Sequence, residues 1–323
     1  FNSFFIEFYR GEYMKNAIRY YYNMNVDDIH QNNKNYRFYY NGYLYVLTLY
    51  EDNIEKINEI YNIHVNVLQT GLYCHQIILN IENMPFTKLN EKNYILLKVL
   101  VNSEQVSKKI DLDDIIYFSK SYVFQKNNNM AKKSWIDLWS VKTDYIEYQI
   151  NQFGIKYPII SEGASYYIGM AENAISYLVN NKLNEELTYY IAHRRLSINS
   201  TLYDLYNPIN FIVDYSVRDV CEYAKNVFFD NKEKSYMVYE YIKNAGFNYD
   251  EIILLLARFL YPTYYFDMIQ DCIDNKKQEN DLWECIRKYV SRVDEYEAYL
   301  KNIFEYFRHV YNIELVEWII TKK

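Results

Sequence analysis

The residues best suited to chemistry lie in one short stretch, IAHRRLSINS at 191–200, and in the apolar run that follows it. His193 opens the polar part, and Arg195 lies two places later. Asp214 directly follows the apolar run INFIV (209–213), 214 − 193 = 21 places after the histidine. A histidine can move a proton, and a carboxylate can accept one or hold a metal ion. A guanidinium stays protonated and has no acceptor, so Arg195 cannot act as a base.

The elements that must position these residues begin with a small region of strands. Its alternating segment contains Asn41-Gly42, a strong hairpin signal. Apolar residues near helical spacing follow, and Gly71 ends them. The pattern predicts, in order, a helix at 15–30, strands at 36–40 and 43–50, a helix at 53–71, and strands at 75–83 and 93–101. This order is that of a small α+β lobe.

The chain after about residue 110 has mainly helical periodicity, and only 7 Gly and 4 Pro interrupt the whole sequence. The predicted helices cover 111–123, 134–153, 161–181, with Ser161 or Ser165 as the cap, and 217–229, and more follow to the C-terminus. Short β-like runs at 189–196 and 207–215 break this rhythm. We therefore expect an N-terminal extension and helix at 1–30, a small β-rich lobe at 31–105 and a helical lobe at 106–323.

Composition excludes several classes of function. The net charge of −7 argues against a nucleic-acid-binding protein, which usually carries a basic face. No apolar run has membrane-spanning length, so we expect no membrane insertion. The four cysteines are widely spread without a CxxC pair, which favours reduced, buried thiols. The 40 tyrosines fit either an AT-rich genome or a surface that binds protein partners.

Four stretches together resemble the aminoglycoside phosphotransferase and choline kinase-like group, especially its bacterial spore-coat kinase-like proteins. They are YYIGMAENAI (166–175), HRRL (193–196), YDLYNPINFIVDYSVRDVCEYAK (203–225) and LLLARFLYPTYYFD (254–267). Their order fits the group from about residue 36 to 310. The resemblance implies an α+β, two-lobed protein-kinase-like fold, with a small β-rich N-lobe and a larger helical C-lobe.

The resemblance also assigns roles to residues. Active members carry H-x-D-x-x-x-x-N and then an I-D motif, in which the first Asp handles the proton of the attacking hydroxyl. The Asn and the second Asp hold Mg²⁺ against the nucleotide phosphates. His193 matches the His and Asp214 matches the metal-binding Asp. Asp219 resembles an Asp that braces this loop.

Three positions depart from the group. Arg195 stands where the catalytic Asp is expected, and Ser200 where the metal-binding Asn is expected, although the adjacent Asn199 could replace it. Thr48 stands where the nucleotide-binding Lys is expected, and the nearest lysine in the lobe, Lys56, lies on the next helix. The phosphate-binding turn is reduced to Asn41-Gly42, without a G-x-G-x-x-G motif.

These departures favour a degenerate kinase-like protein, or pseudokinase, which needs no cofactor and works by binding protein partners. The resemblance places it in the cytoplasm or on the spore coat. The alternative is an active small-molecule phosphotransferase that uses ATP and Mg²⁺, with Asp214 as metal ligand and a base such as Asp204. A further alternative is a helical interaction protein unrelated to kinases, which predicts no five-stranded lobe.

Asp214 itself has two interpretations. It is either a Mg²⁺ ligand or a carboxylate paired with Arg194, Arg195 or Arg218, and an arginine pair beside it favours the ion pair. An arginine-lined pocket could also bind a phosphorylated ligand without turning it over.

Overall fold

The computed structural model describes residues 2–102, 104–124, 134–154, 158–183, 187–230, 238–274, 279–314 and 316–321. Contacts divide the chain into two compact units. The first unit comprises residues 1–111, 121–125 and 190–214, and the second comprises 112–120, 126–189 and 215–323. The loop and strands that carry His193 and Asp214 therefore belong to the same unit as the N-terminal sheet.

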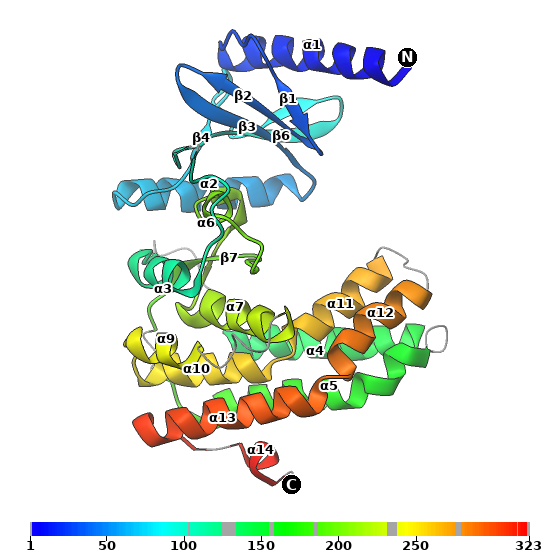
Figure 1. Ribbon diagram of the computed structural model, residues 1–323, viewed down its shortest axis with the longest axis vertical. Helices are drawn as coiled ribbons and strands as arrows, with labels where there is room; N and C mark the ends of the chain where they lie inside the picture. The colour runs from blue at the N-terminus through cyan, green and yellow to red at the C-terminus, as the bar shows by residue number, and fades with distance from the viewer. Residues whose placement is uncertain are drawn as a thin grey trace. The chain divides into compact units, whose positions relative to one another are not determined.

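The first unit is built on an antiparallel sheet of six strands (Figure 1). The strands are β1 (His30–Asn32), β2 (Asn35–Tyr40), β3 (Tyr43–Tyr50), β4 (Gln76–Ile78), β5 (Thr87–Leu89) and β6 (Lys92–Lys98). Their order is β1-β2-β3-β6-β4, and β5 also pairs with β6. Asn41 and Gly42 have φ values of 49° and 78°, as a tight two-residue hairpin requires, and they set Tyr40 opposite Tyr43.

Both faces of this sheet are covered, because successive residues of a strand point to opposite sides. Helix α1 (Asn2–Tyr22) lies on one face, where Met14 and Ile18 share a core with Leu47. Helix α2 (Ile54–Gln69), capped by the Asn53 side chain, lies on the other face and buries Ile57. Figure 1 shows the two helices on opposite sides of the sheet.

A second, two-stranded ladder completes the first unit. Strand β7 (Tyr190–His193) pairs antiparallel with β8 (Phe211–Asp214). Between them lie a single turn of helix, α6 (Leu202–Leu205), and the 3-10 turn η1 (Pro208–Asn210). Helix α2 packs against both η1 and β8, so the ladder is held by the same helix that covers the sheet.

The second unit is helical in its described residues. Its helices are α3 (Leu112–Ser121), α4 (Trp135–Phe153), α5 (Pro158–Asn180), α7 (Val217–Asp230), α9 (Val238–Asn244), α10 (Tyr249–Leu260), α11 (Thr263–Asp274), α12 (Glu279–Val290), α13 (Val293–Tyr311) and α14 (Glu317–Thr321). Helix α10 is the centre of the core: it packs against α5, α7 and α13, and every residue from 252 to 260 is buried.

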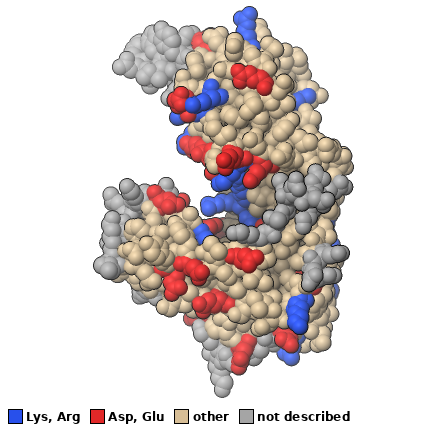
Figure 2. Space-filling model, turned by 180° about the vertical axis from the view of Figure 1, so that it is seen from behind, with Lys and Arg blue, Asp and Glu red and all other residues tan. Residues whose placement is uncertain are grey.

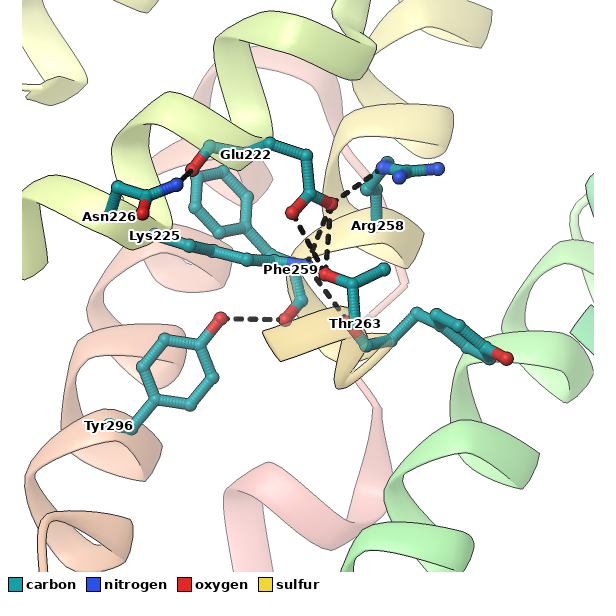
Figure 3. A network of polar contacts seen from close by, with 8 residues as sticks. Glu222, Lys225, Asn226, Arg258, Phe259, Thr263 and Tyr296 are labelled. Carbon is teal, nitrogen blue, oxygen red and sulfur yellow. Dashed lines mark hydrogen bonds and ion pairs between the residues drawn. The ribbon is translucent and has the colours of Figure 1, made fainter. Parts of the chain in front are cut away.

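A buried polar network joins α7 to α10 and to the start of α11 (Figure 3). The Glu222 carboxylate accepts hydrogen bonds from Arg258 Nε at 2.8 Å, from Lys225 Nζ at 3.3 Å and from the Thr263 hydroxyl at 2.8 Å. Lys225 also donates to the Tyr261 carbonyl at 2.8 Å. One carboxylate thus forms ion pairs with two cations whose side chains are 2% and 5% exposed, and buried charges require such partners.

The structure confirms most predicted elements and corrects others. The helix predicted at 15–30 ends at Tyr22, and strands β1 and β5 were not predicted. The strand predicted at 75–83 covers only β4. Because β1 precedes β2, Asn41-Gly42 joins the second and third strands of the sheet. Helix α5 begins at Pro158, so neither Ser161 nor Ser165 caps it.

The state of the cysteines and the charge of the surface agree with the expectations from the composition. Cys74, Cys221 and Cys272 are free and buried, as predicted, whereas the side chain of Cys285 lies outside those described. Acidic side chains are spread over much of the face seen in Figure 2. Within the described ranges, no single helix has the length and apolar character of a membrane span, although α10 and α11, joined at a 45° bend, meet that test as a pair.

The Glu222 network leads to a stability prediction. Glu222→Gln leaves Lys225 and Arg258 buried without their counter-charge, so we expect the free energy of unfolding to fall by about 3 kcal/mol. Urea denaturation measures it. Glu295→Gln is the matched control, because Glu295 forms a 3.1 Å pair with Arg292 but is 44% exposed. We expect the control to change stability by less than about 1 kcal/mol.

The same network predicts a pH dependence. Burial by itself would raise the pKa of Glu222, but the Lys225 and Arg258 cations outweigh it and lower the pKa from 4.5 to about 2. A carboxyl whose pKa is lower in the folded state stabilises the fold above its unfolded pKa and loses that effect as pH falls. The stability difference between wild type and Glu222→Gln should therefore shrink between pH 4.5 and 2. A constant difference over that range would contradict the assignment.

Candidate functional site

His193 is the last residue of β7 and is 1% exposed. Its Nε2 lies 2.8 Å from the Leu205 carbonyl, and because a carbonyl only accepts, the ring donates this hydrogen bond. The edge of the ring meets Phe211, with the ring centroids 5.3 Å apart. In this geometry His193 ties the end of β7 to helix α6 and is positioned as a brace.

Asp214 lies at the other end of the same ladder and is 6% exposed. In the register of β7 and β8, His193 is opposite Phe211 and Tyr190 is opposite Asp214. The two pairs are three positions apart along the strands, which corresponds to about 10 Å. The ladder therefore holds the histidine and the carboxylate apart, and neither can act directly on the other.

The two arginines after β7 differ in their surroundings. Arg194 Nη1 forms a 3.0 Å ion pair with Asp52, which also binds Lys56 at 2.9 Å in the first turn of α2. The hydrogen bond from Lys56, with the charges of Lys56 and Arg194, keeps the pKa of Asp52 low. Arg195 is exposed. Lys56, the lysine nearest to Thr48 in the sequence of the lobe, is thus engaged in a surface cluster with Arg194.

The loop after the arginines is closed by its own hydrogen bonds. Ser200 Oγ accepts from the Ser197 N–H at 3.0 Å, and the Ser200 carbonyl accepts from the Ile110 N–H at 3.1 Å. The adjacent Asn199 accepts from Lys109 Nζ at 3.1 Å at the surface. Ser200 and Asn199 each have a structural role in this turn.

Asp204, the alternative base, acts as a helix cap. Its Oδ2 accepts from the Thr201 N–H at 2.8 Å and from the Thr201 hydroxyl at 3.0 Å, and together they form a capping box for α6. Its contacts therefore suit it to hold the start of this helical turn.

Thr48 points to the sheet face that α2 and residues 202–209 cover. Its hydroxyl is buried, and Tyr203 of α6 lies beside it. Burial raises the pKa of Tyr203 to about 12, while the Thr48 hydroxyl and the Arg37 guanidinium oppose that rise. Tyr203 also packs on His75, with the ring centroids 5.0 Å apart. Bulky side chains thus occupy the space in front of Thr48.

The same covering extends along the sheet. Ile209 joins the core of Ile95 and Leu97, and Tyr203 packs against Val46 and Val99 as well. The His75 N–H donates to the Tyr206 carbonyl at 2.9 Å, which anchors the segment. Residues 202–209, which follow the loop and precede β8 in the chain, are here called the covering segment. They therefore cover this face of β3 and β6.

The donor set fits a nucleotide–Mg²⁺ complex poorly. Among the described residues, no three His, Cys, Asp or Glu side chains are grouped so that they could hold a metal ion. Asp214 is the one acid at a position where the resemblance expects a metal ligand. Arg195, Ser200 and Thr48 stand where the resemblance expects the base, the second metal ligand and the nucleotide-binding lysine.

Sequence reasoning missed the residues that shape this site most. Tyr203 and Ile209 lie within a stretch that was singled out, but their packing depends on a sheet face more than 100 residues away in sequence. The apolar positions in LYDLYNPI were the available signal. No local signal indicates that Asp52 meets Arg194.

Comparison with solved structures confirms the fold. A spectinomycin phosphotransferase, solved with ADP and spectinomycin, matches with a TM-score of 0.60 and 10% identity over 92% of this chain and 98% of that chain. An aminoglycoside phosphotransferase from Alicyclobacillus acidocaldarius matches with a TM-score of 0.59 and 9% identity over 88% and 93%. The interpretation as a helical protein unrelated to kinases is therefore wrong.

Sequence comparison identifies the family. The endospore coat-associated protein YutH of Bacillus subtilis (strain 168) is 24% identical over 213 residues, which are 60% of this chain and 62% of that relative. The match thus spans less than two thirds of the relative's length. Residues 15–303 match a family described as "Spore coat putative kinase YutH". The chain, an α+β protein of kinase-like fold, belongs to this YutH family of spore-coat kinase-like proteins.

Proposed function

We propose that this chain does not transfer phosphate and acts as a binding or scaffold protein, with the spore coat as its setting. The observation that carries the proposal is the covering segment. Tyr203 and Ile209 pack on the sheet face where the resemblance expects the nucleotide, beside Thr48 in place of the lysine. A nucleotide would have to displace this packing, which costs the burial of an aromatic and an aliphatic side chain.

The polar substitutions support the proposal independently of the packing. Arg195 cannot accept a proton, and no change in its surroundings corrects this, because a guanidinium stays charged in proteins. Asp204 is engaged in the capping box of α6. The coat setting is supported by the relative whose name places it at the endospore coat. Before assembly we expect the chain in the cytoplasm, with protein partners and without nucleic acid.

The alternative is an ATP- and Mg²⁺-dependent phosphotransferase of the aminoglycoside or choline kinase type. The family description and the place of Asp214 at the end of β8 favour it. It requires the covering segment to move away from the sheet, a base other than Arg195, and a metal site centred on Asp214. Nucleotide binding and the stability of variants distinguish it from the proposal.

Asp214→Asn tests the role of the carboxylate. If Asp214 is paired with an arginine, its loss leaves a cation uncompensated, so the melting temperature falls without any ligand. Mg-ATP should then shift the melting temperature of neither form. If Asp214 is a metal ligand, the variant without ligand is as stable as wild type or more so. Mg²⁺-dependent stabilisation of wild type that vanishes in Asp214→Asn would overturn the proposal. Thermal denaturation with and without Mg-ATP measures both effects.

Tyr203→Ala tests the covering segment. Removal of a ring packed on Val46, Val99 and His75 should lower the free energy of unfolding by about 2–3 kcal/mol. Tyr39→Ala is the matched control, because Tyr39 lies on the same sheet but is 62% exposed, and we expect a change within about 0.5 kcal/mol. An unchanged urea midpoint for Tyr203→Ala would contradict the packing on which the proposal depends.

A further inference from the structure

Helix α4 has two apolar faces, and only one of them is buried. The buried face consists of Trp135, Trp139, Thr143, Ile146 and Ile150. On another side of the helix four residues are spaced by three, four and three positions, as in a coiled-coil seam. These residues, here called the α4 stripe, are Leu138, Val141, Tyr145 and Tyr148, and they are 43%, 63%, 41% and 59% exposed.

The α4 stripe is unusual for a surface helix, whose outer side is normally polar. Helix α13 provides the comparison within the same unit, since both helices have 19 residues. Its exposed residues are mostly polar, namely Asp294, Glu295, Asn302, Glu305, Arg308 and His309, and its exposed apolar residues, Ala298 and Val310, are twelve positions apart and form no stripe. The stripe gains no stability from solvent exposure, and a valine at a solvent-facing helix position lowers helix propensity. Contiguous exposed apolar residues of this kind mark interaction sites.

Charged residues border the stripe on one side. Asp137, Asp144 and Glu147 each precede a stripe residue by one position, so all three lie about 100° around the helix in the same direction. All three are exposed. On the other border Lys142 donates a hydrogen bond to Gln270 of α11 and so is directed towards the unit's own surface. The accessible border of the stripe is therefore acidic.

We propose that the α4 stripe binds an amphipathic helix of a partner protein, with lysines or arginines beside its apolar positions. The partner's apolar residues would cover the stripe over about 15 Å, or three turns, and its cations would face Asp137, Asp144 and Glu147. A second copy of α4 fits less well, because antiparallel pairing brings two acidic borders together. The α4 stripe would be the surface through which the chain carries out the binding role proposed above, and this inference rests on that proposed function.

The test uses the full chain and two synthetic helical peptides of about three turns. Both have leucines at the seam positions, and they differ only in lysines or glutamates at the flanking positions. Fluorescence anisotropy measures the dissociation constants. We expect the lysine peptide to bind at least about tenfold more tightly than the glutamate peptide, and Val141→Glu with Tyr148→Glu to weaken it at least about tenfold. Asn302→Glu on α13 is the matched control and should leave binding unchanged.

A charge reversal provides a second, independent readout. Asp144→Lys with Glu147→Lys should reverse the preference, so that the glutamate peptide binds more tightly. Circular dichroism checks that these exposed substitutions keep the fold. Equal binding of the two peptides, or an unaffected Val141→Glu, Tyr148→Glu variant, would overturn the proposal. A dimer in sedimentation analysis that dissociates in that variant would assign the stripe to a second copy and overturn it as well.

The two proposals can fail separately. Mg-ATP binding concerns Asp214 and the covering segment, and the peptides concern α4. A chain that binds Mg-ATP and also the lysine peptide would refute the proposed covering of the nucleotide site and leave the docking surface in place. A chain that binds neither would refute the docking surface alone.

Discussion

Burial of one face of the N-terminal sheet is the constraint on which the candidate site depends. Every second side chain of β3 and β6 points to that face and must be shielded from water, and α2 covers only part of the face. The covering segment supplies the remainder through Tyr203 and Ile209. The hydrogen bond from His193 to the Leu205 carbonyl and the capping box of Asp204 then follow as means of holding this segment in place. Residues that could serve chemistry are thus engaged in packing and turn formation.

Two charged clusters among the described residues contribute differently to stability. Asp52, Lys56 and Arg194 meet at the surface, where solvent and salt screen their attraction. Glu222, Lys225 and Arg258 meet inside the second unit, where each charge would be costly alone. Arg258 also lies over the Trp135 ring, 4.8 Å from its centroid. Substitution at Glu222 therefore concerns the fold, and substitution at Asp52 concerns only local contacts.

Likeness of fold does not by itself imply likeness of chemistry. The backbone matches phosphotransferases over most of its length at about one identical residue in ten. Packing tolerates such divergence because many apolar combinations fill a core, whereas a proton acceptor or a metal ligand can be replaced by very few groups. The shared fold therefore identifies the architecture of this chain and not its chemistry.

The sequence by itself determined the hairpin at Asn41-Gly42, most helices of the second unit and the place of His193 and Asp214 on two short strands. These features follow from periodicity and turn chemistry, which are local. The short strands β1 and β5 and the end of the first helix were missed because three-residue strands carry too little pattern. Only the tertiary structure placed Tyr203 against Thr48 and Asp52 beside Arg194, since these contacts join segments about 140 or more residues apart. Whether a polar residue is free for chemistry depends on such contacts, and no local pattern encodes them.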